Sequence, residues 1–275
     1  MKQIDFMEIQ GIKVGHAQNL KAATGCTVII CEKGATVGVD VRGGAPGTRE
    51  TDLLNPVNLV QKAHAILLTG GSAFGLDSAA GVMQYLEENN IGFDVQVTKV
   101  PIVCGAALFD LAIGDHKVRP DKEMGYQACL TANSIECKQG CVGAGTGATV
   151  GKILGVKQAM KSGLGCYAIQ AGDLKIGALV AVNCLGDIID PLTNKKLASM
   201  AQNGYARAMR PAHTMYDGDT IFAMATGEIK AGLSTVGLLS ARVMERAVVE
   251  AVKNAEPLFG IKSYSYLKGD GHENI

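Results

Sequence analysis

The sequence has no excess of charge of either sign, because 26 lysines and arginines balance 26 aspartates and glutamates among its 275 residues. A neutral chain has no overall field to attract nucleic acid or an anionic membrane surface. It also lacks the ~18 consecutive apolar residues needed to cross a bilayer. Its first residues, MKQIDFMEIQ, lack the basic start and apolar run of a secretory signal. We therefore expect a cytoplasmic protein with neither a nucleic-acid nor a membrane partner.

A complete set of metal ligands is also missing. Cys137 and Cys141 could supply half of a metal site, but no second pair of cysteines or histidines lies at a suitable spacing. Most of the eight cysteines lie inside apolar segments, which favours buried free thiols in a reducing compartment. We expect no metal and no other cofactor.

Apolar residues and glycine are what the chain has in quantity. Its hydrophobic content of 47% argues against disorder. The 35 glycines occur in GG and GxG clusters, which suggests tight turns and close backbone contacts in a layered fold. Because no internal repeat or linker is visible, residues 1–275 are expected to form one α+β domain with packed layers.

Hydrophobic periodicity and turn residues predict the main elements. Residues 23–44 predict two strands joined by a Lys-Gly turn, and residues 63–89 predict a buried strand, a Gly-Gly turn and a helix that starts near Ser72. The remaining predictions are a hairpin over 165–190 that turns at Gly172–Asp173, a helix over 193–209, a strand over 220–228 and a helix over 236–255.

Two glycine-rich stretches resemble known motifs but lack residues that those motifs require. In GAGTGATVGK (143–152), a phosphate-binding loop would need glycine where Thr146 stands and a hydroxyl where Ile153 stands. Lys152 remains of interest, because glycines let a backbone approach a ligand closely. In TGGSAFG (69–75), Phe74 replaces the second glycine of a hydrolase elbow, so Ser72 is more simply the N-cap of the following helix.

Other candidates leave two interpretations open. The loop RGGAPGTRETD (42–52) is either a surface ion-pair loop or the lip of a pocket. Asn183 closes an apolar run, so its amide is either a structural hydrogen-bonding group or an oxyanion donor. The histidines, including His213, are isolated in sequence, which favours structural roles. Asp217 and Asp219 lie on one side of an extended chain, where two carboxylates repel unless they serve another group.

Together these segments resemble the DmpA-type self-processing aminopeptidases, which include L-aminopeptidase/D-esterases, β-peptidyl aminopeptidases and nylon-oligomer hydrolases. The resemblance covers nearly the whole chain in order. It rests on VGHAQNLKAATGCTVI, VDVRGGAPGTRETDLL, LTGGSAFGLDSAAGVMQYLEE, VPIVCGAALFDL, GAGTGATVGK, VAVNCLGDIIDP and MAQNGYARAMRPAHTMYDGDTIFAMATGE.

The resemblance implies an αββα sandwich similar to N-terminal nucleophile hydrolases, with different strand connectivity. It implies self-cleavage before a Ser or Thr, which becomes the nucleophile, and assembly as a homo-oligomer acting on small peptides or amino amides. Carried over by residue, it implies four catalytic positions and four in the substrate pocket. These are Asn183 as oxyanion donor, Lys152 beside the nucleophile and the acidic pair Asp217 and Asp219, and then Phe109, Gly70, Gly71 and Ser72.

The nucleophile itself has no counterpart. No strand headed by Ser or Thr lies between Asp190 and Arg210, where the resemblance requires one. Thr220, which heads the strand after Asp219, is a weaker candidate because the resemblance places it on a different strand. We therefore expect an impaired or inactive amide hydrolase, a possible pseudoenzyme. The alternative is a non-catalytic small-ligand-binding or assembly protein that retains the fold.

Overall fold

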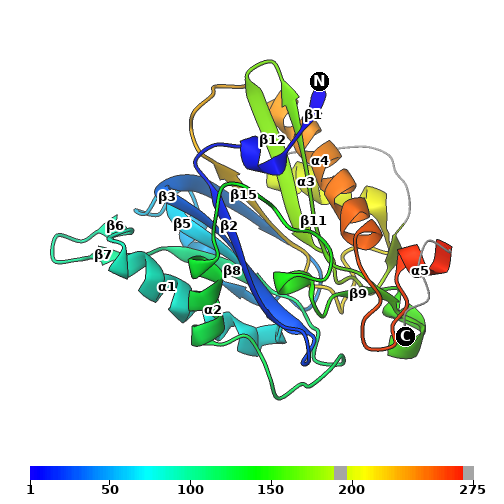
Figure 1. The fold of residues 1–275 in the computed structure, drawn as a ribbon. Coiled ribbons are helices and arrows are strands. Elements are labelled where there is room, and N and C mark those ends of the chain that lie inside the picture. Colours follow the sequence, from blue (N-terminus) through cyan, green and yellow to red (C-terminus); the bar gives the residue numbers. More distant parts are fainter. Residues whose placement is uncertain (189–196, 269–275) are drawn as a thin grey trace.

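Two β-sheets face each other between two layers of helices in the computed structural model, which describes residues 1–188 and 197–268 (Figure 1). Helices α1 (Ser78–Glu88) and α2 (Lys122–Leu130) cover the outer face of one sheet. Helix α4 (Leu233–Lys253) covers the outer face of the other sheet, and α3 (Leu197–Ala208) packs against α4. The predicted α+β sandwich is confirmed. Among the described residues, no helix is long and apolar enough to cross a membrane.

The larger sheet has six strands in the order β15-β3-β5-β8-β4, with β2 paired to β3 beside this path. Its strands β5 and β8 are parallel, and helix α1 belongs to the segment that connects them. The strands are β2 (Lys13–Asn19), β3 (Thr24–Val41), β4 (Thr48–Arg49), β5 (Ala63–Thr69), β8 (Val103–Ala107) and β15 (Thr220–Ala225).

The prediction of two strands over residues 23–44 is wrong. The expected pair of strands is a single strand of 18 residues, with a register shift between Ile30 and Ala35 in its pairing with β5. Gly34 sits in this irregularity with φ +68°. The predicted Lys-Gly turn is therefore absorbed as a local bulge, because both halves of the strand find partners in the same sheet.

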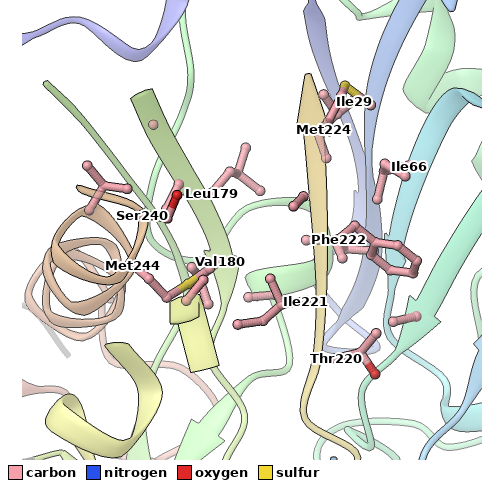
Figure 2. Close-up of a pocket in the computed structure, with 18 of the residues that line it drawn as sticks. Ile29, Ile66, Leu179, Val180, Thr220, Ile221, Phe222, Met224, Ser240 and Met244 are labelled. Carbon is pink, nitrogen blue, oxygen red and sulfur yellow. The ribbon is translucent and has the colours of Figure 1, made fainter. Parts of the chain in front are cut away.

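The smaller sheet has the order β1-β11-β12, with strands β1 (Lys2–Ile4), β11 (Leu164–Ala171) and β12 (Leu174–Ala181). Strands β11 and β12 form the predicted hairpin, which turns at Gly172 and Asp173. Gly172 has φ +61°, a conformation that glycine adopts without steric cost. A cavity lies between β12 and β15, the edge strands of the two sheets (Figure 2).

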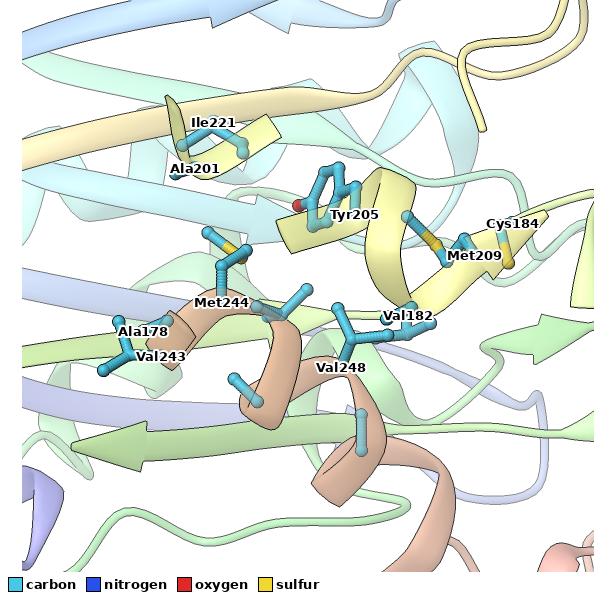
Figure 3. Packing of buried hydrophobic residues seen from close by; sticks show 14 of the residues in the cluster. Ala178, Val182, Cys184, Ala201, Tyr205, Met209, Ile221, Val243, Met244 and Val248 are labelled. Atoms are coloured by element: carbon cyan, nitrogen blue, oxygen red, sulfur yellow. The ribbon is translucent and has the colours of Figure 1, made fainter. Parts of the chain in front are cut away.

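In the core of the second half, α4 packs on β11 and β12 of the small sheet, and α3 packs against α4 and against β15 and β3 of the larger sheet (Figure 3). Val180 and Val182 of β12, Tyr205 of α3, and Val243 and Met244 of α4 belong to one buried cluster. In β12 the buried residues alternate, as expected for a strand whose one face meets a helix. Burial of each such side chain contributes about 1.5–3 kcal/mol, so this cluster anchors the helix layer.

The remaining elements are short. They are β6 (Phe93–Asp94), β7 (Lys99–Val100), β9 (Thr149–Val150), β10 (Met160–Lys161), β13 (Asp187–Ile188), β14 (Met209–Arg210), α5 (Tyr264–Lys268) and the 3-10 helices η1 (Phe6–Glu8), η2 (Asp52–Leu54), η3 (Ser72–Asp77), η4 (Gly143–Gly145), η5 (Lys152–Leu154) and η6 (Val156–Gln158). Between Asp190 and Arg210 the described residues form α3 and β14, and residues 189–196 lie outside the described part.

Candidate active site

Polar side chains meet at one end of the cavity between the sheets. The cavity has a volume of about 910 Å³, and most of the residues lining it are apolar. Asn183, which follows β12, and Asp217 and Asp219, which precede β15, all line it. The backbone N–H of Leu185 donates to Asp217 Oδ1 at 3.1 Å, which brings the two segments together. The predicted candidates thus come from both edge strands.

Lys152 lies outside the lining of the cavity and holds Asn183, which lines it. Lys152 Nζ donates to Asn183 Oδ1 at 2.8 Å, to Asn183 O at 3.2 Å and to Thr149 O at 2.8 Å. Asn183 Nδ2 donates to Phe109 O at 2.9 Å. Burial lowers the pKa of Lys152 from 10.5 to about 8. The amide of Asn183 is held by these bonds, and one of its two Nδ2 hydrogens is used by them.

The two carboxylates are held by the loop that carries them. Asp217 is buried, and its Oδ2 accepts from Thr214 Oγ1 at 2.7 Å and from Thr214 N at 3.2 Å. Asp219 Oδ2 accepts from the backbone N–H of His213 and contacts His213 Nδ1, both at 2.8 Å. The repulsion expected between them is thus offset by hydrogen bonds to each carboxylate.

The loop 42–52 forms the lip of the cavity, as the second of its two interpretations predicts. Ala45, Pro46 and Gly47 line the cavity, and Ala45 N donates to Asp217 O at 3.0 Å. A Cβ on Gly43 would lie 2.2 Å from Asp217 O, and Gly43 has φ +87°. Glycine is required here because the two loops touch through their backbones.

Two of the four predicted pocket residues line the cavity, and the other two pack behind it. Phe109 and Ser72 line the cavity, although the Phe109 side chain is 57% exposed. Gly70 and Gly71 lie outside the lining, which corrects their predicted place in the pocket. A Cβ on Gly70 would lie 2.1 Å from Asp110 Oδ2, and Gly71 N donates to Asp110 Oδ1 at 2.7 Å. They pack against a buried carboxylate instead.

The hydroxyl residues Ser72 and Thr220 both line the cavity. Ser72 is the first residue of η3 rather than an N-cap, with φ +55°, and α1 begins only at Ser78. Thr220 lines the cavity at the start of β15, and its Oγ1 donates to Gly218 O at 2.8 Å. The carbonyl before it, Asp219 O, accepts from Arg42 N at 2.7 Å within the pairing with β3.

The glycine-rich loop 143–152 is part of the core. Residues 142–150 are buried, and a Cβ on Gly147 would lie 2.0 Å from Ala23 O. Lys161 is fully buried, and its Nζ donates to Gly145 O at 3.1 Å, to Ala148 O at 2.8 Å and to Ser162 O. A phosphate group cannot reach these amides, so the loop positions Lys152 rather than binding a nucleotide.

His213 and Lys161 were not recognised from the sequence. His213 is isolated in the sequence, yet the turn after it brings it onto Asp219, six residues away. No periodic pattern could signal this contact, because a turn and not a regular element makes it. Lys161 had no signal either, since its acceptors are backbone carbonyls.

The cysteines fit their predicted state. All eight are free, and six of them are buried. Burial raises the pKa of Cys184, which lines the cavity, to about 12, so this thiol stays protonated near neutral pH. Within the part of the chain that the structure describes, no three His, Cys, Asp or Glu side chains gather as a metal site.

Comparison with known proteins shows which family the chain resembles. The profile of peptidase family S58 matches residues 5–193 and 188–265, in two segments that meet at 188–193. An uncharacterized aminopeptidase of Mycobacterium tuberculosis is 35% identical over 338 residues, covering 94% of this chain and 96% of that protein. A 6-aminohexanoate-oligomer endohydrolase of Kocuria sp. is 28% identical over 312 residues, covering 90% and 85%. Both alignments exceed the 275 residues of this chain, so part of each relative has no counterpart here.

Solved structures agree with this assignment at the level of the fold. The L-aminopeptidase D-Ala-esterase/amidase from Ochrobactrum anthropi, described as a new variant among the Ntn hydrolase fold, superposes with a TM-score of 0.69 at 16% identity, covering 92% of this chain and 87% of that one. The PH0078 protein from Pyrococcus horikoshii gives 0.72 at 19% identity, covering 94% and 89%. The resemblance inferred from the sequence motifs is confirmed: this chain belongs to peptidase family S58.

Proposed function

We propose that this chain binds small peptides or amino amides at the polar end of the cavity, and that by itself it hydrolyses them slowly or not at all. The proposal rests on Asn183, Asp217 and Asp219, which all line a mostly apolar cavity, and on Lys152 Nζ, which holds the Asn183 amide from behind the lining. Membership of a peptidase family, with relatives named aminopeptidase, makes amide compounds the first ligands to consider.

The polar groups match both ends of such a ligand. An amide carbonyl can accept the remaining Nδ2 hydrogen of Asn183, in the manner of an oxyanion donor. A free α-amine can pair with Asp217 or Asp219, which bring negative charge to the same end of the cavity. The apolar walls would then take the ligand's side chains.

Slow hydrolysis follows from the partners of the lysine. The three hydrogen bonds of Lys152 Nζ go to a carbonyl or amide oxygen of Thr149 or Asn183, and none of these acceptors is a hydroxyl. Among the described residues, the hydroxyl that heads β15, Thr220, donates to a backbone carbonyl. An activated nucleophile needs a base within hydrogen-bond reach, and neither contact supplies one.

The first test is the intact mass of the purified chain under denaturing conditions. We expect one species at 28.6 kDa, because no processed nucleophile is needed for binding. Two fragments that sum to this mass would contradict the proposal, and the first residue of the second fragment would identify the nucleophile. We also propose a homo-oligomer, which the resemblance implies, and a cytoplasmic location, which the free and mostly buried cysteines favour. Sedimentation in dilute buffer tests the first, and cell fractionation tests the second.

The second test separates binding from hydrolysis. Alanine amide and Ala-Ala are expected to raise the melting temperature of the chain, following mass action, while alanine p-nitroanilide is turned over little or not at all. Asn183→Ala should abolish the thermal shift, whereas Gln158→Ala at an exposed position should keep it. Rapid turnover would refute the hypothesis that hydrolysis is impaired. The absence of any shift in the melting temperature of the unmodified chain would refute the hypothesis that it binds these compounds.

A further inference from the structure

We propose that the cavity accepts one extended apolar peptide strand, supplied by another polypeptide, which pairs with the open edge of β12. This inference does not depend on the proposed function, since a strand can bind along the apolar walls whether or not small amides bind at the polar end.

The edge of β12 is open in the part of the chain that the structure describes. There β12 pairs with β11 alone, and the register joins Ala171 to Leu174 across the two-residue turn. In such a hairpin the flanking pair is hydrogen-bonded, and bonded pairs alternate from there. The main-chain groups of Lys175, Gly177, Leu179 and Ala181 therefore point away from β11.

The other side of β11 confirms this alternation. Leu164 N and O exchange hydrogen bonds with Gly140, on the side of β11 away from β12. Leu164 opposes Ala181, so Ala181 belongs to the set whose main-chain groups are not used by β11. Val182, one residue further, donates to Gly163 O at 3.0 Å, as the alternation requires.

The unused edge faces the cavity. All consecutive residues from Leu174 to Val182 line it, although side chains of a strand alternate between its two faces. When consecutive residues of a strand all line a cavity, the main-chain edge of the strand, rather than one of its faces, lies toward the cavity. Strand β15 shows the same pattern, since every residue from Thr220 to Ala225 lines the cavity and β15 pairs with β3 alone among the described residues.

A peptide strand fits this space better than a compact ligand. The volume of about 910 Å³ lies at the upper end of small-molecule pockets, and the cavity extends along two strands. Leu179, Phe222 and Met224 give it apolar walls (Figure 2). A small apolar ligand would leave the row of N–H and C=O groups on β12 unpaired, whereas an added strand pairs them.

The relatives indicate where such a strand comes from. The family profile matches in two segments that meet at 188–193, directly after β13. The aligned relative from Mycobacterium tuberculosis carries a part that this chain lacks. The junction of the two matched segments follows Cys184, which lines the cavity, by a few residues, so a segment inserted there in a relative starts close to this space. In this chain we assign that role to a segment of a separate polypeptide.

The test uses the full chain and synthetic peptides. Twelve-residue peptides that tile the part of the Mycobacterium tuberculosis relative without a counterpart here are titrated by calorimetry, and amide hydrogen exchange locates their binding. We expect one apolar peptide to bind and to slow exchange in residues 174–182 at least tenfold. Binding of none of these peptides, or protection elsewhere, would overturn the proposal. So would equal protection by octanoate, or concentration-dependent protection without peptide, which would indicate a second copy of the chain.

Strand pairing makes a sharper prediction about alternate amides. The bound peptide is synthesised with N-methyl groups on its odd or on its even residues, and only one of the two sets is expected to lose binding, by tenfold or more. In the protein, Leu179→Pro removes one cavity-facing N–H, and Leu179→Ala keeps it. Proline should weaken binding at least tenfold more than alanine. Equal effects of the two methylated peptides would refute strand pairing even if the proline variant does not fold.

Discussion

At the scale of single residues, the site depends on a lysine ammonium that is largely withdrawn from water. Lys152 has three acceptors, which is the number of hydrogens its ammonium can donate. Burial nevertheless favours its neutral form and lowers its pKa to about 8. At neutral pH the group is therefore charged but holds its proton less firmly than a surface lysine.

This shift predicts a pH dependence of stability. Between about pH 8 and pH 10.5 the unfolded chain keeps the Lys152 proton and the folded chain has lost it, so stability rises with pH. Relative to Lys152→Met, which cannot titrate, the unmodified chain should gain about 2 kcal/mol of unfolding free energy between about pH 7 and pH 9.5. Urea unfolding at both pH values measures this difference, and a constant difference would contradict the lowered pKa.

At the scale of elements, helices approach the sheets through glycine. A Cβ on Gly15 of β2 would lie 2.0 Å from Ala128 O of α2. A Cβ on Gly165 of β11 would lie 2.1 Å from Ala247 O and 2.3 Å from Ala251 N of α4. Both outer helix layers therefore rest on backbone contacts that leave no space for a methyl group.

Gly165→Ala is expected to destabilise the fold by about 1–3 kcal/mol or more, because α4 has to move away from β11. Urea unfolding measures the loss. The matched control is Gly38→Ala in β3, where an added Cβ meets nothing within 4 Å and φ is not positive. The control should be neutral or slightly stabilising, because alanine loses less backbone entropy than glycine. Equal effects of both substitutions would refute close packing as the cause.

At the scale of the whole molecule, the two sheets do not close on each other at their edges. The cores on either side are well packed, since α4 with β12 and α1 with β5 contribute side chains that are fully buried. Between them β12 and β15 keep the cavity of about 910 Å³. Because packed interiors hold few voids larger than water, such a space indicates a place for a ligand or a partner.

The open space predicts that larger side chains are tolerated on its wall. Ala181→Leu, on the cavity side of β12, should raise the unfolding free energy by on the order of 1 kcal/mol by filling apolar space. Ala168→Leu on β11, where the side chain is 1% exposed, should lower it by about 1–3 kcal/mol. Thermal or urea unfolding compares the two variants. A loss in both would show that the cavity closes in solution.

The sequence by itself determined the family, the layer type and most of the regular elements. Local signals were sufficient for the hairpin at Gly172, for α4 and for β15, because turn residues and apolar periodicity act within a few residues. The motifs also placed Lys152, Asn183, Asp217 and Asp219 in one site, and the structure joins the first three by hydrogen bonds or through the adjacent backbone.

The tertiary structure alone decided the contacts between distant segments. Leu185 and Asp217 meet across 32 residues, and Lys161 reaches carbonyls of a loop 13 and 16 residues away. Strand β3 is continuous because the sheet offers partners to both its halves, which its Lys-Gly pair cannot reveal. Such contacts depend on the whole chain folding at once. Periodicity reports only which face of an element is apolar, not which segment will cover that face.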